Sequence, residues 1–245
     1  MDLRITSEQH LDEGLLERRF TLGDVPGILW TPAAPGPLVL LGHPGGVEAM
    51  YPRLLGRAQA LARIGAAAAT LELPGSGERP RLSVVDGARA DLRTALAAGE
   101  PVPTDVIDRL ILPLVDQAVP ELRAAIDALL ALPGITGPVA CAGGVISIGV
   151  RLARVEPRLV AAGLFAGSFV PAAILDEARE VTIPLHVLLQ WDDQGNDRQA
   201  ALDLFDAFGS SEKTLLANLG GHTGVPAHAG DDATRFFARH LGLAR

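Results

Sequence analysis

The chain has 245 residues, enough for one large domain or two small ones. Hydrophobic residues make up 48% of it and the net charge is −8, so the composition is that of a globular protein with a sizeable core. Acidic and basic residues are interspersed, which excludes the basic face of a nucleic-acid-binding protein, and we expect no nucleic-acid partner.

No targeting or membrane segment is expected. The first residues are polar and acidic, without the basic segment and apolar stretch of a signal peptide. The most apolar run, Leu159 to Leu175, is interrupted by Gly163, Gly167 and Pro171, which predicts a buried strand and helix rather than a membrane span. We therefore expect a cytoplasmic protein without a membrane partner. Its oligomeric state is left open.

Short apolar runs bounded by glycine, proline or polar residues predict the strands. In chain order they are Leu16 to Leu22, Gly27 to Thr31, Leu38 to Leu41, Ala66 to Leu73, a strand through Val139, Leu159 to Phe165, Pro184 to Gln190 and Lys213 to Asn218. The predicted helices are Tyr51 to Ile64, Val115 to Leu132, a helix ending near Val155, Ala172 to Ala178, Arg198 to Phe208 and Asp231 to His240. Alternating strands and helices favour one α/β domain over residues 1–245, with a mostly parallel sheet flanked by helices.

Residues 79 to 114 do not fit this alternation, because they are polar and contain prolines and short helical pieces. An insertion here would lie over the carboxyl ends of the strands, where such sheets bind ligands. We predict a small cap, or lid, in this segment. The alternative is an irregular surface connection.

Residues 139 to 148 read VACAGGVISI, a small apolar strand that passes through two glycines into an apolar helix. The pattern is typical of the nucleophile elbow, the sharp strand-to-helix turn written G-x-S-x-G, but it contains no serine at the expected place. The elbow needs small residues two positions before and after the nucleophile. This rule favours Ala142, flanked by Ala140 and Gly144, over Cys141, flanked by Val139 and Gly143.

Chemistry favours the other register, because cysteine is a nucleophile and alanine is not. Cys141 is the only cysteine, so it forms no internal disulfide, and no zinc-ligand spacing is present. A lone cysteine in a core strand is often simply a small apolar residue. Both registers stay open.

Further motifs follow other predicted strands. Residues 42 to 46 read GHPGG, a turn of the kind that supplies a backbone N–H to an oxyanion hole. Because Pro44 has no N–H, Gly45 or Gly46 would be the donor, with Gly143 as a second contributor and His43 at the substrate side. These residues are candidate oxyanion-hole or substrate-binding groups.

The acid and base candidates lie further along the chain. Asp193 follows the strand that ends at Gln190, and His222 lies in GGHTGVP before the last helix. The order nucleophile, acid, histidine is that of the hydrolase triad, in which the acid orients the imidazole and the imidazole takes the proton of the nucleophile. Asp192 and Asp197 are competing acids.

These motifs together resemble the α/β-hydrolase superfamily, and more narrowly the dienelactone-hydrolase-like and small actinobacterial α/β-hydrolases. The resemblance rests on LVLLGHPGG, LELPGSGER, the elbow with VEPR after its helix, LLQWDD, LFDAFGSSEK and GGHTGVP, and it covers nearly the whole chain. It implies that the family serine falls on Ala142, the acid on Asp193 and the base on His222.

The resemblance further implies an enzyme acting on the carbonyl of an ester, lactone or thioester, with a small-molecule substrate and no cofactor or metal. Three explanations of the missing serine stay open: it has been replaced by alanine, Cys141 serves instead, or the pocket does non-hydrolytic work such as cyclisation, epimerisation or binding.

Overall fold

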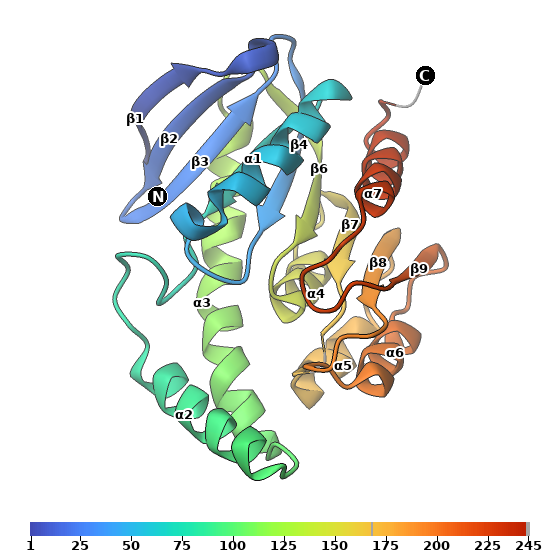
Figure 1. Cartoon of the computed structure of the whole chain (residues 1–245). Helices are drawn as coiled ribbons and strands as arrows, with labels where there is room; N and C mark the ends of the chain where they lie inside the picture. Colours follow the sequence, from blue (N-terminus) through green and yellow to red (C-terminus); the bar gives the residue numbers. More distant parts are fainter. Residues whose placement is uncertain (168, 244–245) are drawn as a thin grey trace.

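The first 31 residues of the chain form three antiparallel strands that lead into a parallel sheet (Figure 1). The computed structural model describes residues 1–167 and 169–243. The strands are β1 (Leu3–His10), β2 (Leu16–Leu22), β3 (Val25–Thr31), β4 (Gly36–Gly42), β5 (Ala67–Leu71), β6 (Ile135–Gly143), β7 (Leu159–Phe165), β8 (Leu185–Gln190) and β9 (Lys213–Asn218). They join in one sheet of order β1-β2-β3-β5-β4-β6-β7-β8-β9, parallel from β5 onward, which confirms the predicted mostly parallel sheet.

Helices cover both faces of this sheet. They are α1 (Val47–Arg63), α2 (Ser83–Ala98), α3 (Thr104–Leu130), α4 (Ile146–Val155), α5 (Ala172–Ala178), α6 (Arg198–Ala207) and α7 (Ala227–His240). One apolar cluster contains side chains of α1 and α7, and the other contains side chains of α2 to α6. Successive strand residues point to opposite faces, so strands β3 to β7 each contribute side chains to both clusters.

Strand β1 is absent from the sequence prediction. Its residues are exposed except for Leu3, which is half-buried, so the strand shows no alternation of apolar and polar side chains. It is held at the sheet edge by antiparallel pairing with β2. Backbone pairing of this kind leaves no side-chain pattern to detect.

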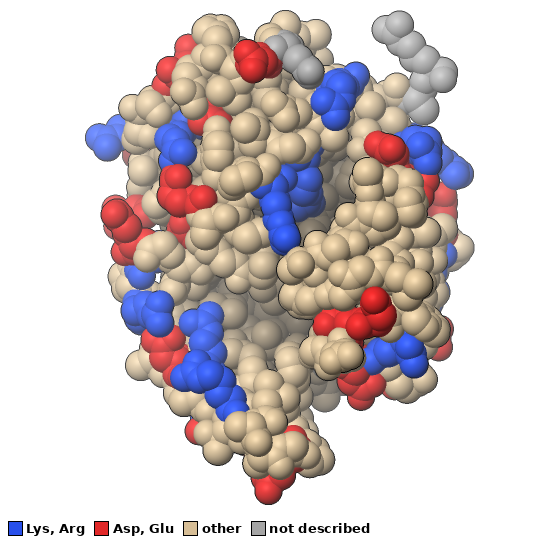
Figure 2. Space-filling model, viewed as in Figure 1, with Lys and Arg blue, Asp and Glu red and all other residues tan. Residues whose placement is uncertain are grey.

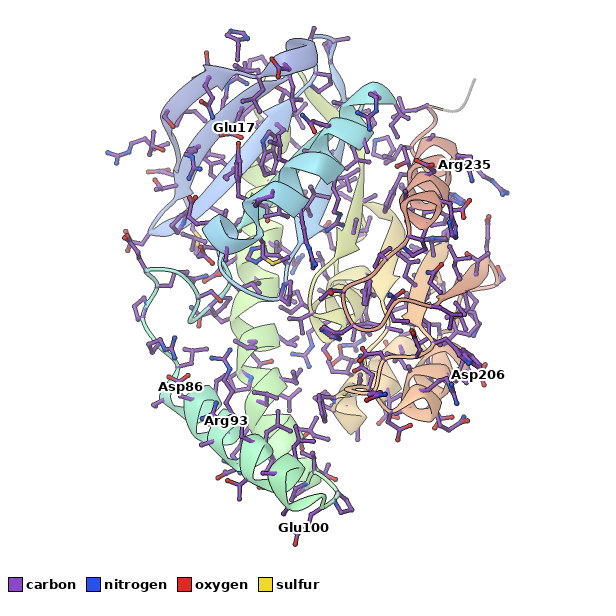
Figure 3. All side chains as sticks on the ribbon, in the orientation of Figure 1. Glu17, Asp86, Arg93, Glu100, Asp206 and Arg235 are labelled. Atoms are coloured by element: carbon purple, nitrogen blue, oxygen red, sulfur yellow. The ribbon has the colours of Figure 1, made fainter. Side chains whose placement is uncertain are left out.

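The segment predicted as a cap contains α2 and the first part of α3. The predicted helix start at residue 115 is wrong, because α3 begins at Thr104 and includes Pro113 and Pro120. These prolines made the sequence look interrupted, but burial of apolar side chains along α3 offsets the lost helix hydrogen bonds. Figure 1 shows α2 and the first turns of α3 projecting beyond the end of the sheet. Asp86, Arg93 and Glu100 lie on this projection, at the outside of the molecule (Figure 3).

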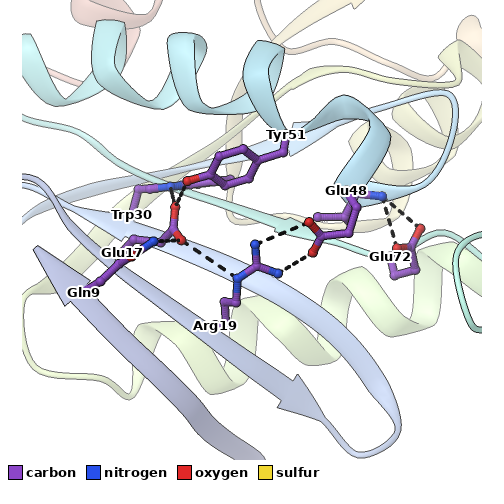
Figure 4. Close-up of polar contacts among 8 residues, drawn as sticks. Gln9, Glu17, Arg19, Trp30, Glu48, Tyr51 and Glu72 are labelled. Carbon is purple, nitrogen blue, oxygen red and sulfur yellow. Dashed lines mark hydrogen bonds and ion pairs between the residues drawn. The ribbon is translucent and has the colours of Figure 1, made fainter. Parts of the chain in front are cut away.

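A buried polar cluster ties the antiparallel strands to α1 (Figure 4). The Glu17 carboxylate, 1% exposed, accepts hydrogen bonds from Gln9 Nε2 (2.8 Å), Trp30 Nε1 (2.7 Å) and the Tyr51 hydroxyl (2.7 Å). Arg19 Nε lies 4.0 Å from Glu17 Oε1. The buried charge is therefore surrounded by donors from β1, β2, β3 and α1.

Among the described residues, no helix combines the length and the apolar character needed to span a bilayer.

Candidate active site

The two candidate nucleophile positions lie inside β6. Cys141 pairs with Leu40 and Ala162, and Ala142 pairs with Leu41 and Gly163, so both belong to the regular ladder. Cys141 is 7% exposed in the cluster with α2 to α6, and Ala142 is 4% exposed in the cluster with α1 and α7. Neither side chain stands on a turn.

Cys141 has the environment of a packed core residue. Burial raises the pKa of its thiol to about 12. Reactive cysteines have lowered pKa values in electropositive, accessible surroundings. The position of Cys141 therefore does not favour a thiolate nucleophile.

The turn after β6 is formed by Gly143 and Gly144. Their φ angles are +73° and +86°, the left-handed region that favours glycine. A Cβ at Gly144 would lie 2.9 Å from the Gly42 Cα, so the backbones that follow β4 and β6 approach too closely for a side chain. Gly143 and Gly144 form this strand-to-helix turn and carry no side chain that could act as a nucleophile.

Arg57 reaches this turn from α1. Its Nη1 donates to the Gly42 carbonyl (3.1 Å) and its Nη2 donates to the Ala142 carbonyl (2.6 Å). The side chain is partly buried, and burial lowers the pKa of the guanidinium to about 10, so it stays protonated at neutral pH. Sequence reasoning missed Arg57, because nothing distinguishes it from the other arginines of the same helix.

Asp193 and His222 are brought together beyond the ends of β8 and β9. His222 Nδ1 lies 2.7 Å from Asp193 Oδ2. Asp193 is buried, whereas 71% of the His222 side chain is exposed. The contact at Nδ1 directs Nε2 away from the carboxylate, toward any substrate.

The carboxyl of Asp193 is held in its charged form. Its burial raises the pKa, but hydrogen bonds from His222, the Gly195 amide and the Asn196 side chain lower it more, and the net pKa is below the usual value. The Gly195 amide donates to Oδ1 over 2.9 Å, and Asn196 donates to Oδ2. An ionised Asp193 is suited to orient an imidazole and to stabilise it when protonated.

The two competing acids have other partners. Asp192 accepts hydrogen bonds from the amides of Gly220 and Gly221, at 2.9 to 3.1 Å, and so holds the loop that carries His222. Asp197 caps α6 by accepting from the amides of Gln199 and Ala200.

Gln190, which sequence reasoning missed, donates from Nε2 to the Gly221 carbonyl over 2.7 Å. Its place at the end of β8, two positions before Asp192 and three before Asp193, was the available signal.

The loop after β4 carries the other candidate oxyanion groups. His43 is 1% exposed, and its Nε2 lies 2.8 Å from the Leu71 carbonyl, whereas its Nδ1 has no hydrogen-bond partner among the described residues. Its role at the substrate side stays a prediction. Gly45 and Gly46 precede α1, and Glu72 lies 3.1 to 3.2 Å from the Val47 amide. A Cβ at Gly45 would meet nothing within 4 Å, so open space lies beside this backbone.

Topology places these groups at one edge of the sheet. The turn at Gly143 ends β6, Asp193 follows β8, and β7 alone separates the two strands. Two strand spacings amount to about 10 Å, which a histidine side chain and a small substrate can bridge. Figure 2 shows basic side chains in the middle of this view, over α1, at the margin of a hollow.

The loop between β8 and α6 is open to solvent beside Asp193. A hollow of about 620 Å³ is lined by this loop, including Trp191, Asp193 and Arg198. The Arg198 guanidinium lies 4.3 Å from the centre of the Trp191 ring. Within residues 1–167 and 169–243, no three histidine, cysteine or acidic side chains lie together as metal ligands would.

Known proteins share this architecture. No model of a protein family matches the sequence, and no curated protein matches it either. A cold-adapted esterase from an Arctic intertidal metagenomic library matches at 28% identity and a TM-score of 0.74, over 98% of this chain and 100% of that one. A dienelactone hydrolase from Anabaena variabilis matches at 18% identity and a TM-score of 0.61, over 96% of this chain and 98% of that one.

An acetyl xylan esterase from Paenibacillus sp. R4 matches at 12% identity and a TM-score of 0.64, over 98% of this chain and 88% of that one. The chain therefore has the α/β-hydrolase fold. The three solved structures named above are two esterases and a dienelactone hydrolase, in agreement with the resemblance drawn from the sequence motifs.

Proposed function

We propose that this protein is a hydrolase of small esters, lactones or thioesters in which His222, oriented by Asp193, acts as a general base. The observation that carries the proposal is the 2.7 Å contact between His222 Nδ1 and Asp193 Oδ2. The esterase and dienelactone-hydrolase neighbours support the class of reaction.

Water is the nucleophile in the mechanism that we propose. The turn residues Gly143 and Gly144 carry no reactive side chain, and Cys141 and Ala142 are packed within β6. His222 Nε2 takes a proton from a water molecule as the water oxygen attacks the substrate carbonyl. The resulting imidazolium then gives a proton to the leaving oxygen or sulfur as the bond to the acyl carbon breaks.

The surroundings of the pair favour apolar substrate groups. Trp191, Leu219 and Val225 are 43%, 69% and 38% exposed, and all three lie on the two loops that carry Asp193 and His222. Large exposed apolar side chains around polar groups are typical of a binding site. Backbone amides near Gly45 and in the Gly143–Gly144 turn are the candidate oxyanion donors.

The test is hydrolysis of p-nitrophenyl acetate and butyrate by the wild-type protein and by His222→Ala. We expect the variant to lose about 10²- to 10⁴-fold in kcat/KM, the usual contribution of a general base. His228→Ala is the matched control, because His228 lies exposed on α7. Equal activity of wild type and His222→Ala would refute the proposal.

A second experiment addresses the nucleophile. Cys141→Ala should keep wild-type turnover, and iodoacetamide should label native Cys141 slowly because the thiol is buried with a pKa of about 12. Mass spectrometry should find no acyl adduct during turnover. An adduct on Cys141 would instead assign it as the nucleophile.

A non-hydrolytic function is the second candidate, and the glycine turn is the observation that favours it. A His–Asp pair without a nucleophile can move a proton at a carbon next to a carbonyl, as an epimerase or cyclase requires. Exchange of substrate hydrogen for deuterium in D₂O, without release of acid and alcohol, would identify this function. Release of acid that contains ¹⁸O from labelled water would identify hydrolysis.

A further inference from the structure

The imidazole of His222 is carried by a glycine turn, residues Gly220 to Gly224, and has little packing of its own. The side chain is 71% exposed, and its recorded polar partner is Asp193. The turn closes on itself, because the Gly224 amide donates to the Gly220 carbonyl over 3.1 Å. Gly220 and Gly221 have φ angles of +140° and +63°, which favour glycine. The position of the imidazole therefore depends on the groups that hold the backbone of this turn.

Gln190 holds the peptide group immediately before His222. Its side chain extends from the last residue of β8, and Nε2 donates to the Gly221 carbonyl over 2.7 Å. Gln190 is 3% exposed, and its Oε1 has no hydrogen-bond partner within residues 1–167 and 169–243. Burial of an amide that is only half satisfied costs free energy, which an apolar side chain at this strand end would avoid. The contact with Gly221 is the described interaction that accounts for a glutamine here.

Asp192 binds the same glycine turn through two amides. Its Oδ1 accepts from the amides of Gly220 and Gly221 over 2.9 Å, and its Oδ2 lies 3.1 Å from the Gly220 nitrogen. These amides, that of Gly221 first, lower the pKa of the Asp192 carboxyl, so it remains an acceptor at neutral pH. Strand pairing continues between the two anchors, since the Trp191 amide donates to the Asn218 carbonyl over 2.7 Å. One carbonyl and two amides thus tie the turn to the end of β8.

We propose that Gln190 and Asp192 are positioning residues for His222. The Gly221 carbonyl belongs to the peptide group that leads into His222, so the hydrogen bond from Gln190 restricts the rotation that would carry the imidazole away from Asp193. Acid and imidazole are then fixed to the same strand end, which keeps Nε2 directed toward the substrate. The inference rests on the proposed function for the reaction that His222 serves, but the placement of the imidazole can be measured without turnover.

The first test compares ester hydrolysis by the wild-type protein, Gln190→Met and Asp192→Ala. Methionine keeps the length and burial of the side chain but removes the donor to the Gly221 carbonyl. Asp192 is exposed, so Asp192→Ala removes an acceptor without opening a cavity in the core. We expect each variant to lower kcat for p-nitrophenyl butyrate by roughly 10- to 10²-fold, the cost of a small misplacement of a catalytic group. KM should change little, because the variants alter the position of His222 and not ground-state binding.

The second test measures the tautomer of His222 by ¹⁵N NMR of protein labelled at histidine, with His222→Ala to assign the signal. In the wild type at pH 8, the contact with Asp193 should hold the ring proton on Nδ1. In Gln190→Met and in Asp192→Ala, we expect a mixture of the Nδ1–H and Nε2–H tautomers. A folded variant that keeps both the wild-type tautomer and the wild-type kcat would overturn the role of the residue that it replaces.

Ser210→Ala is the matched control. Ser210 is 6% exposed, and its Oγ donates to the Glu212 carbonyl over 3.1 Å, before the opposite end of β9. The substitution removes a buried side-chain hydrogen bond to a backbone carbonyl, as Gln190→Met does, but leaves the glycine turn intact. We expect lower stability in thermal melting, with kcat and the His222 tautomer unchanged. An equal loss of kcat in Ser210→Ala would attribute the effect to general destabilisation and overturn the proposal.

The two tests separate the positioning role from the proposed function. If the wild type hydrolyses no ester but Gln190→Met and Asp192→Ala shift the tautomer, the proposed function is refuted and the positioning role stands. If His222→Ala loses turnover while both positioning variants keep the wild-type tautomer and kcat, the proposed function stands and the positioning role is refuted.

Discussion

Glu17 on β2 and Arg57 on α1 are both charged residues withdrawn from solvent, but their surroundings differ. The Glu17 carboxylate receives hydrogen bonds from Gln9, Trp30 and Tyr51, with Arg19 nearby, so its charge is fully surrounded by donors. Arg57 contacts two backbone carbonyls and has no described counterion. The Glu17 carboxylate is satisfied within the fold, whereas Arg57 keeps N–H groups that its two carbonyl contacts do not use.

The two regions also differ in how firmly their polar groups are held. Burial, followed by the hydrogen bond to Glu17, raises the pKa of Tyr51 to about 12, which keeps its hydroxyl a donor at any physiological pH. His222 is largely exposed and has one recorded polar partner, Asp193. Substitutions in the Glu17 cluster should therefore change stability, whereas substitutions of His222 or Asp193 should change turnover.

The largest effect is expected from Asp193→Asn. Loss of the carboxylate removes the group that orients His222 and stabilises its protonated form, so kcat/KM should fall by about 10³- to 10⁴-fold with a small change in melting temperature. Asp197→Asn is the control, since asparagine also caps a helix. Ester hydrolysis and thermal unfolding of both variants measure the effects. A destabilised Asp193→Asn protein with normal turnover would assign Asp193 to the fold.

Glu17→Ala should give the largest loss of stability. It leaves the donors of Gln9, Trp30 and Tyr51 buried without an acceptor, at a cost of about 3 kcal/mol or more. For a chain of this size, 3 kcal/mol corresponds to a fall in melting temperature of roughly 6–12 °C. Turnover per folded molecule should be unchanged, which differential scanning fluorimetry and an ester assay on one sample can check. Loss of activity without loss of stability would contradict the contrast between the regions.

A substitution of Glu156 tests whether another buried carboxylate, held by arginine side chains, also contributes to stability as Glu17 does. Hydrogen bonds from Arg158, opposed by burial and helped by Arg123, lower the pKa of Glu156 to about 2 from 4.5. Because the folded pKa is depressed, Glu156 stabilises the fold above pH 4.5, and this contribution is lost as the pH falls from 4.5 toward 2.

The contribution of Glu156 is about 1–3 kcal/mol, since Arg123 and Arg158 are partly exposed and solvent screens them. Glu156→Gln should therefore be less stable than wild type at pH 7 and show a smaller difference at pH 3. Urea unfolding at both values measures this. A constant difference across the range would mean that packing, not charge, is what Glu156 supplies.

The sequence is sufficient to predict the strands of the sheet apart from β1, but it is insufficient to predict the geometry of the site. Buried strands such as β7 and β9 have apolar runs bounded by turn residues, and strand order then places the segments after β8 and β9 at one edge. The turn after β6 could not be placed to the residue, because ACAGG fits the elbow in more than one register. Only backbone geometry shows that Gly143 and Gly144 carry the positive φ angles.

Arg57 could not be identified from the sequence for a different reason. Its contacts are with carbonyls far away in the sequence, at Gly42 and Ala142, and a backbone carbonyl has no side-chain signature. His43 shows a limit of the same kind. Its place after a strand predicts a substrate contact, but the sequence does not indicate that its ring is buried with Nε2 beside the Leu71 carbonyl.

The smallest effect is expected at the rim of the Glu17 cluster. Glu48 is hydrogen-bonded to Arg19, but 72% of its side chain is exposed, so solvent weakens the attraction. Glu48→Gln should cost less than about 1 kcal/mol in unfolding free energy, because exposed ion pairs contribute little. Urea unfolding at low and high salt measures this loss, which should shrink further as salt screens the pair. A loss comparable to that of Glu17→Ala, unchanged by salt, would mean that Arg19 depends on Glu48 to remain beside Glu17. The Glu17 cluster would then extend to the surface, and its contrast with Arg57, which is held by two backbone carbonyls, would be larger than the buried contacts alone indicate.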